Sequence, residues 1–136
     1  MSGLSGYDRK VATFQIYDPG QDARVNVLKV PANHTYTIEA CDVVVDRTVA
    51  AATDAYVDVS LENAGASGTA QTSMGSSVGG TDGWAAQTPK AFTVTAGAGD
   101  LTAGQYLAVN YAETGTVAPG VISVIVEYVD GIGAKA

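Results

Sequence analysis

The sequence predicts an all-β fold: a single-domain, jelly-roll-like β-sandwich of seven to eight antiparallel strands. Two observations lead to this prediction. Short runs rich in valine and threonine alternate apolar with polar residues, and β-branched residues with a period of two suit the two faces of a pleated strand. Turn residues separate these runs, and no helix-length segment lies between the last three of them. Short strands at this spacing are typical of a sandwich or a barrel.

The expected strands lie near residues 11–17, 23–30, 34–45, 55–62, 90–95, 105–112 and 120–129, with an eighth near 68–75. In the first run, Ala12, Phe14 and Ile16 alternate with more polar residues. The run 34–45 is long, and at Val43-Val44-Val45 it is apolar on both faces. We therefore expect it to bend, either passing from one sheet to the other or running under a neighbouring strand.

The later runs show the same alternation, and it identifies the expected core. In the run 55–62, Asp58 and Ser60 occupy the face opposite to the apolar residues. The side chains expected to share apolar faces are Val57, Val59, Leu61, Phe92, Val94, Leu107, Val109, Tyr111, Ile122, Val124, Val126 and Tyr128. Proline and glycine suit the backbone angles of turns, and they predict turns at Asp18-Pro19-Gly20, at residues 96–100 and at Ala118-Pro119-Gly120.

The chain is expected to consist of an N-terminal arm, residues 1–10, and a sandwich domain, residues 11–136. Residues 63–83 are rich in glycine, serine, threonine and alanine and are long for a loop in a compact domain. We expect them to be either a functional loop or a segment that orders against a partner. A jelly roll is favoured over an immunoglobulin-like sandwich because the Cys…Trp…Cys pattern is absent and Trp84 lies in a glycine-rich loop.

Composition and charge argue against several kinds of partner. The net charge is −7 and only seven residues are lysine or arginine, without a cluster, so we expect neither nucleic acid nor a membrane surface as a partner. No apolar run has the length of a membrane span, and residues 1–6 lack the features of a signal peptide. Cys41 is the single cysteine, and its acidic neighbours favour a small buried hydrophobe over a reactive thiol.

Residues suited to catalysis or metal binding are few, and we expect no enzyme activity, no cofactor and no metal. His34 is the only histidine, and no Gly-x-Ser-x-Gly motif accompanies it. Carboxylates occur in pairs, namely Asp18 with Asp22, Asp42 with Asp46, and Asp54 with Asp58. None of these pairs forms a calcium-loop pattern, so turn and surface roles are expected for them.

Five residues are candidate partner contacts. Leu4, Tyr7, Arg9 and Lys10 lie in the expected N-terminal arm, which holds two of the positive charges of an acidic protein. Trp84 is the fifth, because tryptophan favours interfaces where one end of its ring system stays wet. Two alternatives remain open for Trp84: it anchors a partner, or it folds onto its own domain.

Several segments carry a resemblance to known proteins. They are Val25–Pro31, the Thr37-Ile38-Glu39-Ala40 stretch, Tyr56–Asn63, Leu101–Leu107 and Val121–Tyr128. In these segments the chain resembles the small β-sandwich virion proteins of tailed bacteriophages, especially capsid decoration (cement) proteins. The resemblance implies a jelly-roll subunit, a homotrimer made in the host cytoplasm, that binds the capsid exterior of the virion. There it would tie neighbouring major capsid proteins together.

A different class of protein is the alternative. A carbohydrate-binding or receptor-binding module, for example of a tail or head fibre, would use Trp84 and exposed tyrosines as platforms for sugar rings. An enzyme that depends on His34 is the third hypothesis.

Overall fold

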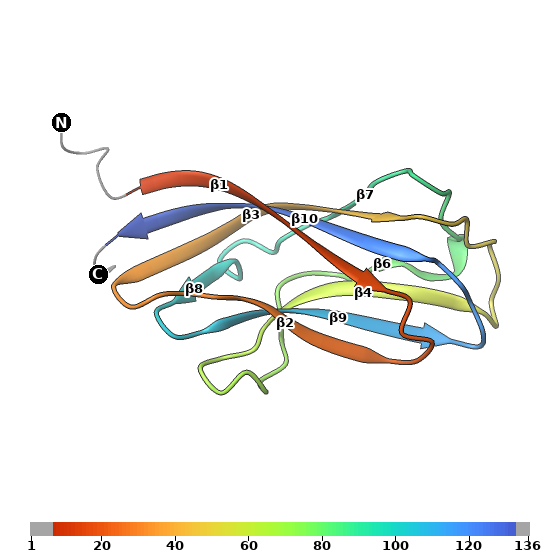
Figure 1. Ribbon diagram of the computed structural model, residues 1–136, viewed down its shortest axis with the longest axis horizontal. Coiled ribbons are helices and arrows are strands. Elements are labelled where there is room, and N and C mark those ends of the chain that lie inside the picture. Colours follow the sequence, from red (N-terminus) through yellow and green to blue (C-terminus); the bar gives the residue numbers. More distant parts are fainter. Residues whose placement is uncertain (1–6, 133–136) are drawn as a thin grey trace.

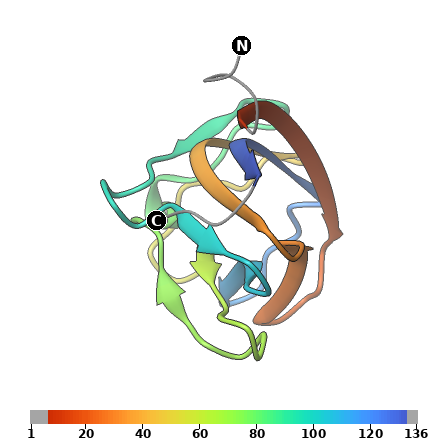
Figure 2. The ribbon, with the colours of Figure 1, turned by 90° about the vertical axis from the view of Figure 1, so that its left-hand side faces the viewer.

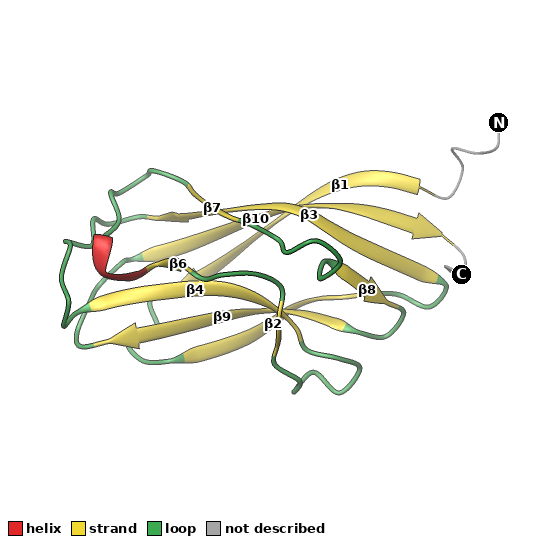
Figure 3. Ribbon diagram, turned by 180° about the vertical axis from the view of Figure 1, so that it is seen from behind, coloured by secondary structure: helices red, strands yellow, loops and turns green. Residues whose placement is uncertain are grey.

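The computed structural model describes residues 7–132, which form two antiparallel β-sheets packed face to face (Figure 1). The strands are β1 (Tyr7–Tyr17), β2 (Ala23–Lys29), β3 (His34–Val45), β4 (Tyr56–Asn63), β5 (Thr72–Ser73), β6 (Val78–Gly79), β7 (Lys90–Phe92), β8 (Asp100–Thr102), β9 (Tyr106–Thr114) and β10 (Val121–Ile132). A turn of 3-10 helix, η1 (Gly80–Asp82), is the only helical element in this part of the chain (Figure 3). No helix in residues 7–132 is long and apolar enough to cross a bilayer.

The strand order defines a jelly roll. The first sheet has the order β1-β10-β3-β7, with β8 also paired to β3; the second has the order β2-β9-β4-β5, with β6 also paired to β4. The antiparallel partners are therefore nested along the chain: β1 with β10, β2 with β9, β3 with β7 and β8, and β4 with β5 and β6. Successive nested pairs alternate between the two sheets, as in a long hairpin that has been rolled up.

The predicted all-β sandwich is confirmed, and the number of strands is higher than expected. The structure has ten strands because two positions are each divided into short pieces, β5 with β6 and β7 with β8. The expected strand 90–95 ends at Phe92, and Val94 forms only an isolated bridge with Gly75. Asp100, expected in a turn, begins β8 because it pairs with Thr37 of β3.

The first strand begins within the expected N-terminal arm, residues 1–10. β1 already begins at Tyr7, which pairs with Gly131 of β10. The polar sequence Asp8-Arg9-Lys10 has no apolar alternation, so its strand conformation follows from pairing with a distant strand and not from local pattern. β1 begins and β10 ends at the same end of the sandwich, which Figure 2 views directly.

The core lies between the two sheets and contains most of the expected side chains. Val57, Val59 and Leu61 are each 1% exposed, and the inward residues of β10 are also buried. Val94 is the exception, because it is only partly buried beside the core. Buried residues outside the expected strands include Val49, Ala64, Trp84 and Leu101.

A β-bulge interrupts the alternation of β3. The register between β3 and β10 shifts between Glu127 and Tyr128, and this leaves Glu39 as an extra residue on β3. The inward side chains are Tyr36 and Ile38 before the bulge, and Cys41, Val43 and Val45 after it. The strand therefore keeps to one sheet, and the expected passage between sheets is wrong. Val44 faces outward and is half-buried.

The long segment after β4 is held by its own domain. Arg24 donates from Nε to Glu62 Oε1 at 2.6 Å and from Nη1 to the carbonyl of Gly68 at 3.1 Å, and its Nη2 donates to the carbonyl of Ala70. Asn26 Nδ2 also donates to the carbonyl of Gly68, at 3.1 Å. These contacts hold the segment against β2 and β4 of its own domain.

The Arg24 contacts lead to a first prediction. Replacing Arg24 by Ala leaves the carbonyl of Ala70 and the Glu62 carboxylate without this donor, and the carbonyl of Gly68 with Asn26 alone, so it should lower the free energy of unfolding by about 1–3 kcal/mol. Hydrogen exchange at the amide of Ala70, which donates to the carbonyl of Ala64, should become faster because the segment opens locally. Arg47→Ala, at an exposed arginine, is the matched control and should change neither quantity. Equal exchange rates in Arg24→Ala and the parent protein would contradict this account.

Candidate functional site

A buried polar cluster lies where β1 begins, β3 begins and β10 ends. Asp130 of β10 is 3% exposed, and it is flanked by His34 of β3 and Lys10 of β1. His34 Nδ1 lies 2.6 Å from Asp130 Oδ1, and Lys10 Nζ lies 3.2 Å from Asp130 Oδ2. An ionised carboxylate only accepts hydrogen bonds, so Nδ1 of His34 carries the proton in this pair. Each carboxylate oxygen therefore has a donor from a different strand.

Two tyrosines adjoin this cluster on the inner side of the first sheet. Tyr36 pairs with Asp130 in the register of β3 and β10, and Tyr128 pairs with Lys10 in the register of β1 and β10. The rings of Tyr36 and Tyr128 are 4.7 Å apart, between centroids, and tilted by 44°. Burial, followed by the nearby Tyr128 and Asp130, raises the pKa of Tyr36. Tyr36 therefore remains a neutral hydrogen-bonding group at ordinary pH.

The electrostatics of the cluster favour the charged forms of Asp130 and Lys10. Burial by itself would raise the pKa of Asp130, but the hydrogen bonds from His34 and Lys10 outweigh it and hold that pKa below its usual value. The pKa of Lys10 is raised, mainly by the hydrogen bond and the charge of Asp130. The two pKa shifts agree, because the Asp130 carboxylate and the Lys10 ammonium stabilise each other.

The cluster has the orienting half of a hydrolytic site. An imidazole held by a carboxylate can act as a base towards a nearby nucleophile. Among the described residues, however, no hydroxyl or thiol is hydrogen-bonded to the other ring nitrogen of His34. The geometry accounts for a structural role, in which the Asp130 carboxylate links β1, β3 and β10 through its contacts with Lys10 and His34. Asp130 was missed by sequence reasoning, although it follows Tyr128 at the inward spacing of two, which is an unusual place for a carboxylate.

The expected partner contacts are not brought together. Leu4 lies outside the described residues. Tyr7 is the first residue of β1. Arg9 points to the outer face of the first sheet, where it forms an ion pair with Glu39, whereas Lys10 points inward to Asp130. Neighbouring residues on a strand take opposite faces, so the two charges expected to act together in an arm serve different surfaces.

Trp84 lies in the core of its own domain, which corresponds to the second of its two alternatives. Its side chain is 3% exposed, and its Nε1 donates to the carbonyl of Thr88 at 3.1 Å. Its backbone exchanges two hydrogen bonds with Val49, of 2.7 and 2.8 Å. Gly79 lets the segment before Trp84 lie close to the backbone of β4, since a Cβ at this position would lie 2.2 Å from the carbonyl oxygen of Val57. A ring buried in this way has no face to offer to a partner or a sugar.

The other candidate residues have local roles. Asp18 Oδ1 accepts from the amide of Gly20 at 2.9 Å, and Asp22 Oδ1 accepts from the amide of Glu113 at 2.8 Å. Within residues 7–132, no group of three or more histidine, cysteine, aspartate or glutamate side chains is arranged to hold a metal ion. Cys41 is 3% exposed, and burial raises its pKa to about 12, so its thiol stays protonated.

The largest exposed apolar side chains on the first sheet belong to β1. Val11 is 62% exposed and Tyr17 is 72% exposed, and their spacing places both on the outer face. β1 is also an edge strand, since only β10 pairs with it in the described part of the chain. This strand therefore combines exposed apolar side chains with a row of backbone groups on its free side.

Comparison with known proteins assigns no family to this chain. No protein-family model matches the chain, and no curated protein matches its sequence. The inferences about function therefore depend on the residues and contacts described above.

The cluster around Asp130 leads to a second prediction. A carboxyl group whose folded-state pKa lies below that of the unfolded chain, about 3.9, stabilises the protein above that value, and the stabilisation is lost as the pH falls through the lower folded-state pKa. Asp130→Asn should therefore lower the free energy of unfolding by about 1–3 kcal/mol at pH 7. Urea titrations of both proteins should show the difference shrinking below about pH 4.

The control for this titration is Glu127→Gln, at an exposed carboxylate on the same strand. It should leave the free energy of unfolding nearly unchanged at every pH. A difference for Asp130→Asn of the same size at neutral and acidic pH would show that the charge of Asp130 does not contribute.

Proposed function

We propose that this protein is a structural virion subunit, a capsid decoration (cement) protein that binds the outside of a phage head and stabilises contacts between major capsid proteins. The resemblance of its segments to such proteins supports the proposal, and so does a jelly-roll fold, an architecture that viral capsid domains use. The sparse charge of the chain also suits a subunit whose surface is covered by neighbours, since charged residues are 15% of the sequence.

The exposed edge and outer face of β1 carry the proposal. A long edge strand offers unpaired backbone groups to a strand of a partner, and natural proteins commonly protect such edges with proline, bulges or charges. β1 pairs with β10 without a register shift along eleven residues, and Val11 lies exposed at its middle. The capsid protein would pair with this edge and cover the side chain of Val11.

Many weak contacts would produce the stabilising effect. One edge strand and a few side chains bury less area than a permanent interface between two proteins. A subunit that touches several capsid proteins at once gains from effective concentration, because each further contact is made within an assembly that already exists. Repeated over a shell, such subunits would resist outward pressure from packaged DNA.

The alternatives that depend on Trp84 or His34 gain no support from the surroundings of these two residues, although Tyr17 stays exposed. A sugar-binding or receptor-binding module that uses Trp84 needs an exposed ring, and this ring is 3% exposed. An enzyme that uses His34 needs a nucleophile beside the imidazole, and among the described residues no hydroxyl or thiol is hydrogen-bonded to this ring, whose Nδ1 pairs with Asp130. A structural role needs neither feature.

The third prediction tests the docking strand. Val11→Lys places a charge in the proposed contact and should reduce occupancy on expanded capsids that lack a decoration protein by about tenfold. Bound protein is measured by sedimentation of the capsids followed by quantitative gel analysis. The matched control is Val25→Lys, at a valine that is 41% exposed on the edge strand β2 of the other sheet. Full occupancy with Val11→Lys, in a protein with an unchanged melting temperature, would exclude β1 as the docking strand.

The fourth prediction concerns the oligomer. The resemblance to decoration proteins implies a homotrimer, so light scattering during size-exclusion chromatography should give three times the chain mass of 13.8 kDa. A mass of one chain across the micromolar range would contradict the trimer, and capsid occupancy would then be expected to follow single-site binding.

A further inference from the structure

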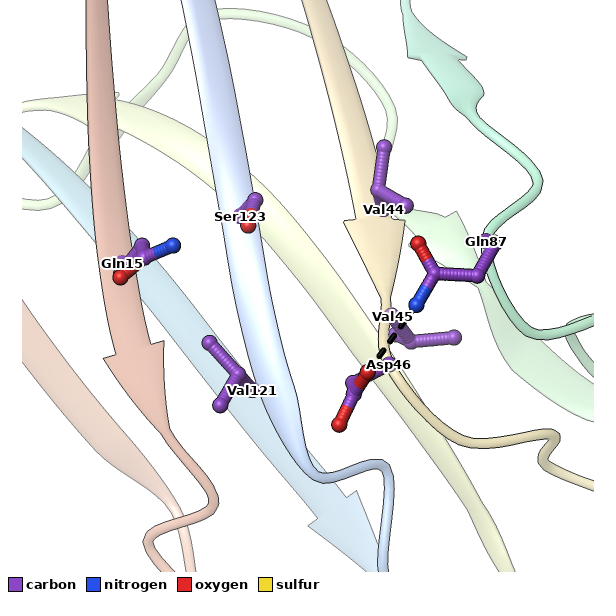
Figure 4. Close-up of a pocket in the computed structure, with 7 residues that line it drawn as sticks. All are labelled: Gln15, Val44, Val45, Asp46, Gln87, Val121 and Ser123. Carbon is purple, nitrogen blue, oxygen red and sulfur yellow. Dashed lines mark hydrogen bonds between the residues drawn. The ribbon is translucent and has the colours of Figure 1, made fainter.

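A hollow of about 330 Å³ lies on the outer face of the first sheet, at the end opposite to the polar cluster. The register of three strands forms it. Gln15 of β1, Ser123 of β10 and Val44 of β3 lie side by side in one row, and Val121 of β10 lies beside Tyr17 in the next. Ser123 is short and stands between two longer side chains, so the middle strand forms a floor and its neighbours form walls (Figure 4).

One wall of the hollow depends on an unusual backbone conformation. Gln87 has a φ of 61°, in the left-handed region where glycine is the usual residue. It lies in a turn closed by a hydrogen bond from the amide of Thr88 to the carbonyl of Ala85, and its own amide donates to the carbonyl of Val45 at 2.9 Å. Strained residues of this kind cluster at ligand sites, where the strain positions a side chain.

The strained turn places an amide beside a carboxylate. Gln87 Nε2 donates to Asp46 Oδ1 at 3.0 Å, and Figure 4 shows both groups on the side of the hollow opposite to Gln15. Within the described residues, no hydrogen bond occupies the side-chain amide of Gln15 or the hydroxyl of Ser123. The hollow therefore presents amide donors and acceptors, one hydroxyl and one oriented carboxylate.

An aromatic ring adjoins these polar groups. A second hollow of about 340 Å³ shares Asp46 and Val121 with the first, and Tyr17 lines it. Tyr17 is 72% exposed, so the face of its ring is open to solvent. An exposed ring next to planar amide and carboxylate groups matches a pyranose, which has an apolar ring face and hydroxyl groups around its rim.

Other classes of ligand fit less well. A peptide strand cannot add to this surface, because the hollow crosses strands whose backbone groups already pair with one another. A phosphate or an acidic sugar would meet the Asp46 carboxylate in the first hollow, whose lining contains no cation; Arg47 lines only the second hollow, together with Asp18 and Asp46. A neutral sugar places only hydroxyl groups against these side chains, and they can both donate and accept.

We infer that the groove formed by Gln15, Ser123, Asp46 and Gln87, with Tyr17 at its margin, binds a neutral saccharide. The site does not use Trp84, and its β1 residues Gln15 and Tyr17 lie further along the strand than the proposed docking residue Val11, so it constitutes a second activity of the same subunit. A subunit on the outside of a particle would then expose a weak sugar-binding site, and the many copies on one particle would add to each other.

The fifth prediction tests this site with isotope-labelled protein. A glycan array first selects neutral sugars, and methyl glycosides of mannose, glucose and galactose are then titrated while ¹H–¹⁵N spectra are recorded. Saturable shifts should involve the side-chain amides of Gln15 and Gln87 and the backbone amides of Asp46 and Ser123. Gln87→Gly removes one amide at a position where glycine is unstrained, so it should weaken binding by about tenfold and leave the melting temperature unchanged or higher. Ser123→Leu fills the floor and should abolish the shifts.

Two controls separate this proposal from the proposed function. Gln71→Ala changes an exposed glutamine outside the groove and should bind sugar as the parent protein does. Val11→Lys should keep sugar binding while it loses capsid occupancy. The inference is overturned if no neutral sugar gives saturable shifts, if only acidic sugars or peptides bind, or if Gln87→Gly and Ser123→Leu bind sugar as tightly as Gln71→Ala does.

Discussion

The structure depends on the insertion of β10 between β1 and β3. β10 pairs with both neighbours, and its inward residues Ile122, Val124 and Val126 are fully buried. The pairing of Tyr7 with Gly131 joins the two ends of the described chain, so the jelly roll closes only when its last strand is in place. Contacts between residues so far apart in sequence must overcome a large loss of chain entropy before they stabilise the fold, and such topologies fold slowly.

The same strand divides the first sheet into surfaces with different chemistry. On its inner side, at the end where β1 begins, Asp130 contacts both His34 and Lys10 and so links three strands. On its outer side, the short Ser123 forms the floor of a polar hollow. Between them, the exposed Val11 lies on the edge strand next to β10.

Sequence reasoning succeeded where burial follows from neighbours two residues apart. The alternation in Tyr56–Asn63 and in Val121–Ile132 predicted both the strands and their inward faces, because a one-sided environment imposes a period of two on the sequence. It failed where pairing comes from far away. β8 was not predicted as a strand, and its first residue, Asp100, was placed in the glycine-rich turn 96–100; β1 was expected to begin near residue 11, and Asp8-Arg9-Lys10 has no apolar face.

The sequence by itself determined the class of fold, the positions of the long strands, most of the core and the acidic, weakly charged character of the surface. Only the tertiary structure decided which polar side chains meet. His34 and Asp130 are separated by 96 positions, and Asp46 and Gln87 by 41, so no local pattern links either pair. It also decided that Trp84 is buried, since the bridge to Val49 and the close approach at Gly79 exist only once the sheets have packed. Alternation records which face of a strand is covered, whereas the identity of the neighbour across the sheet is a property of the folded topology.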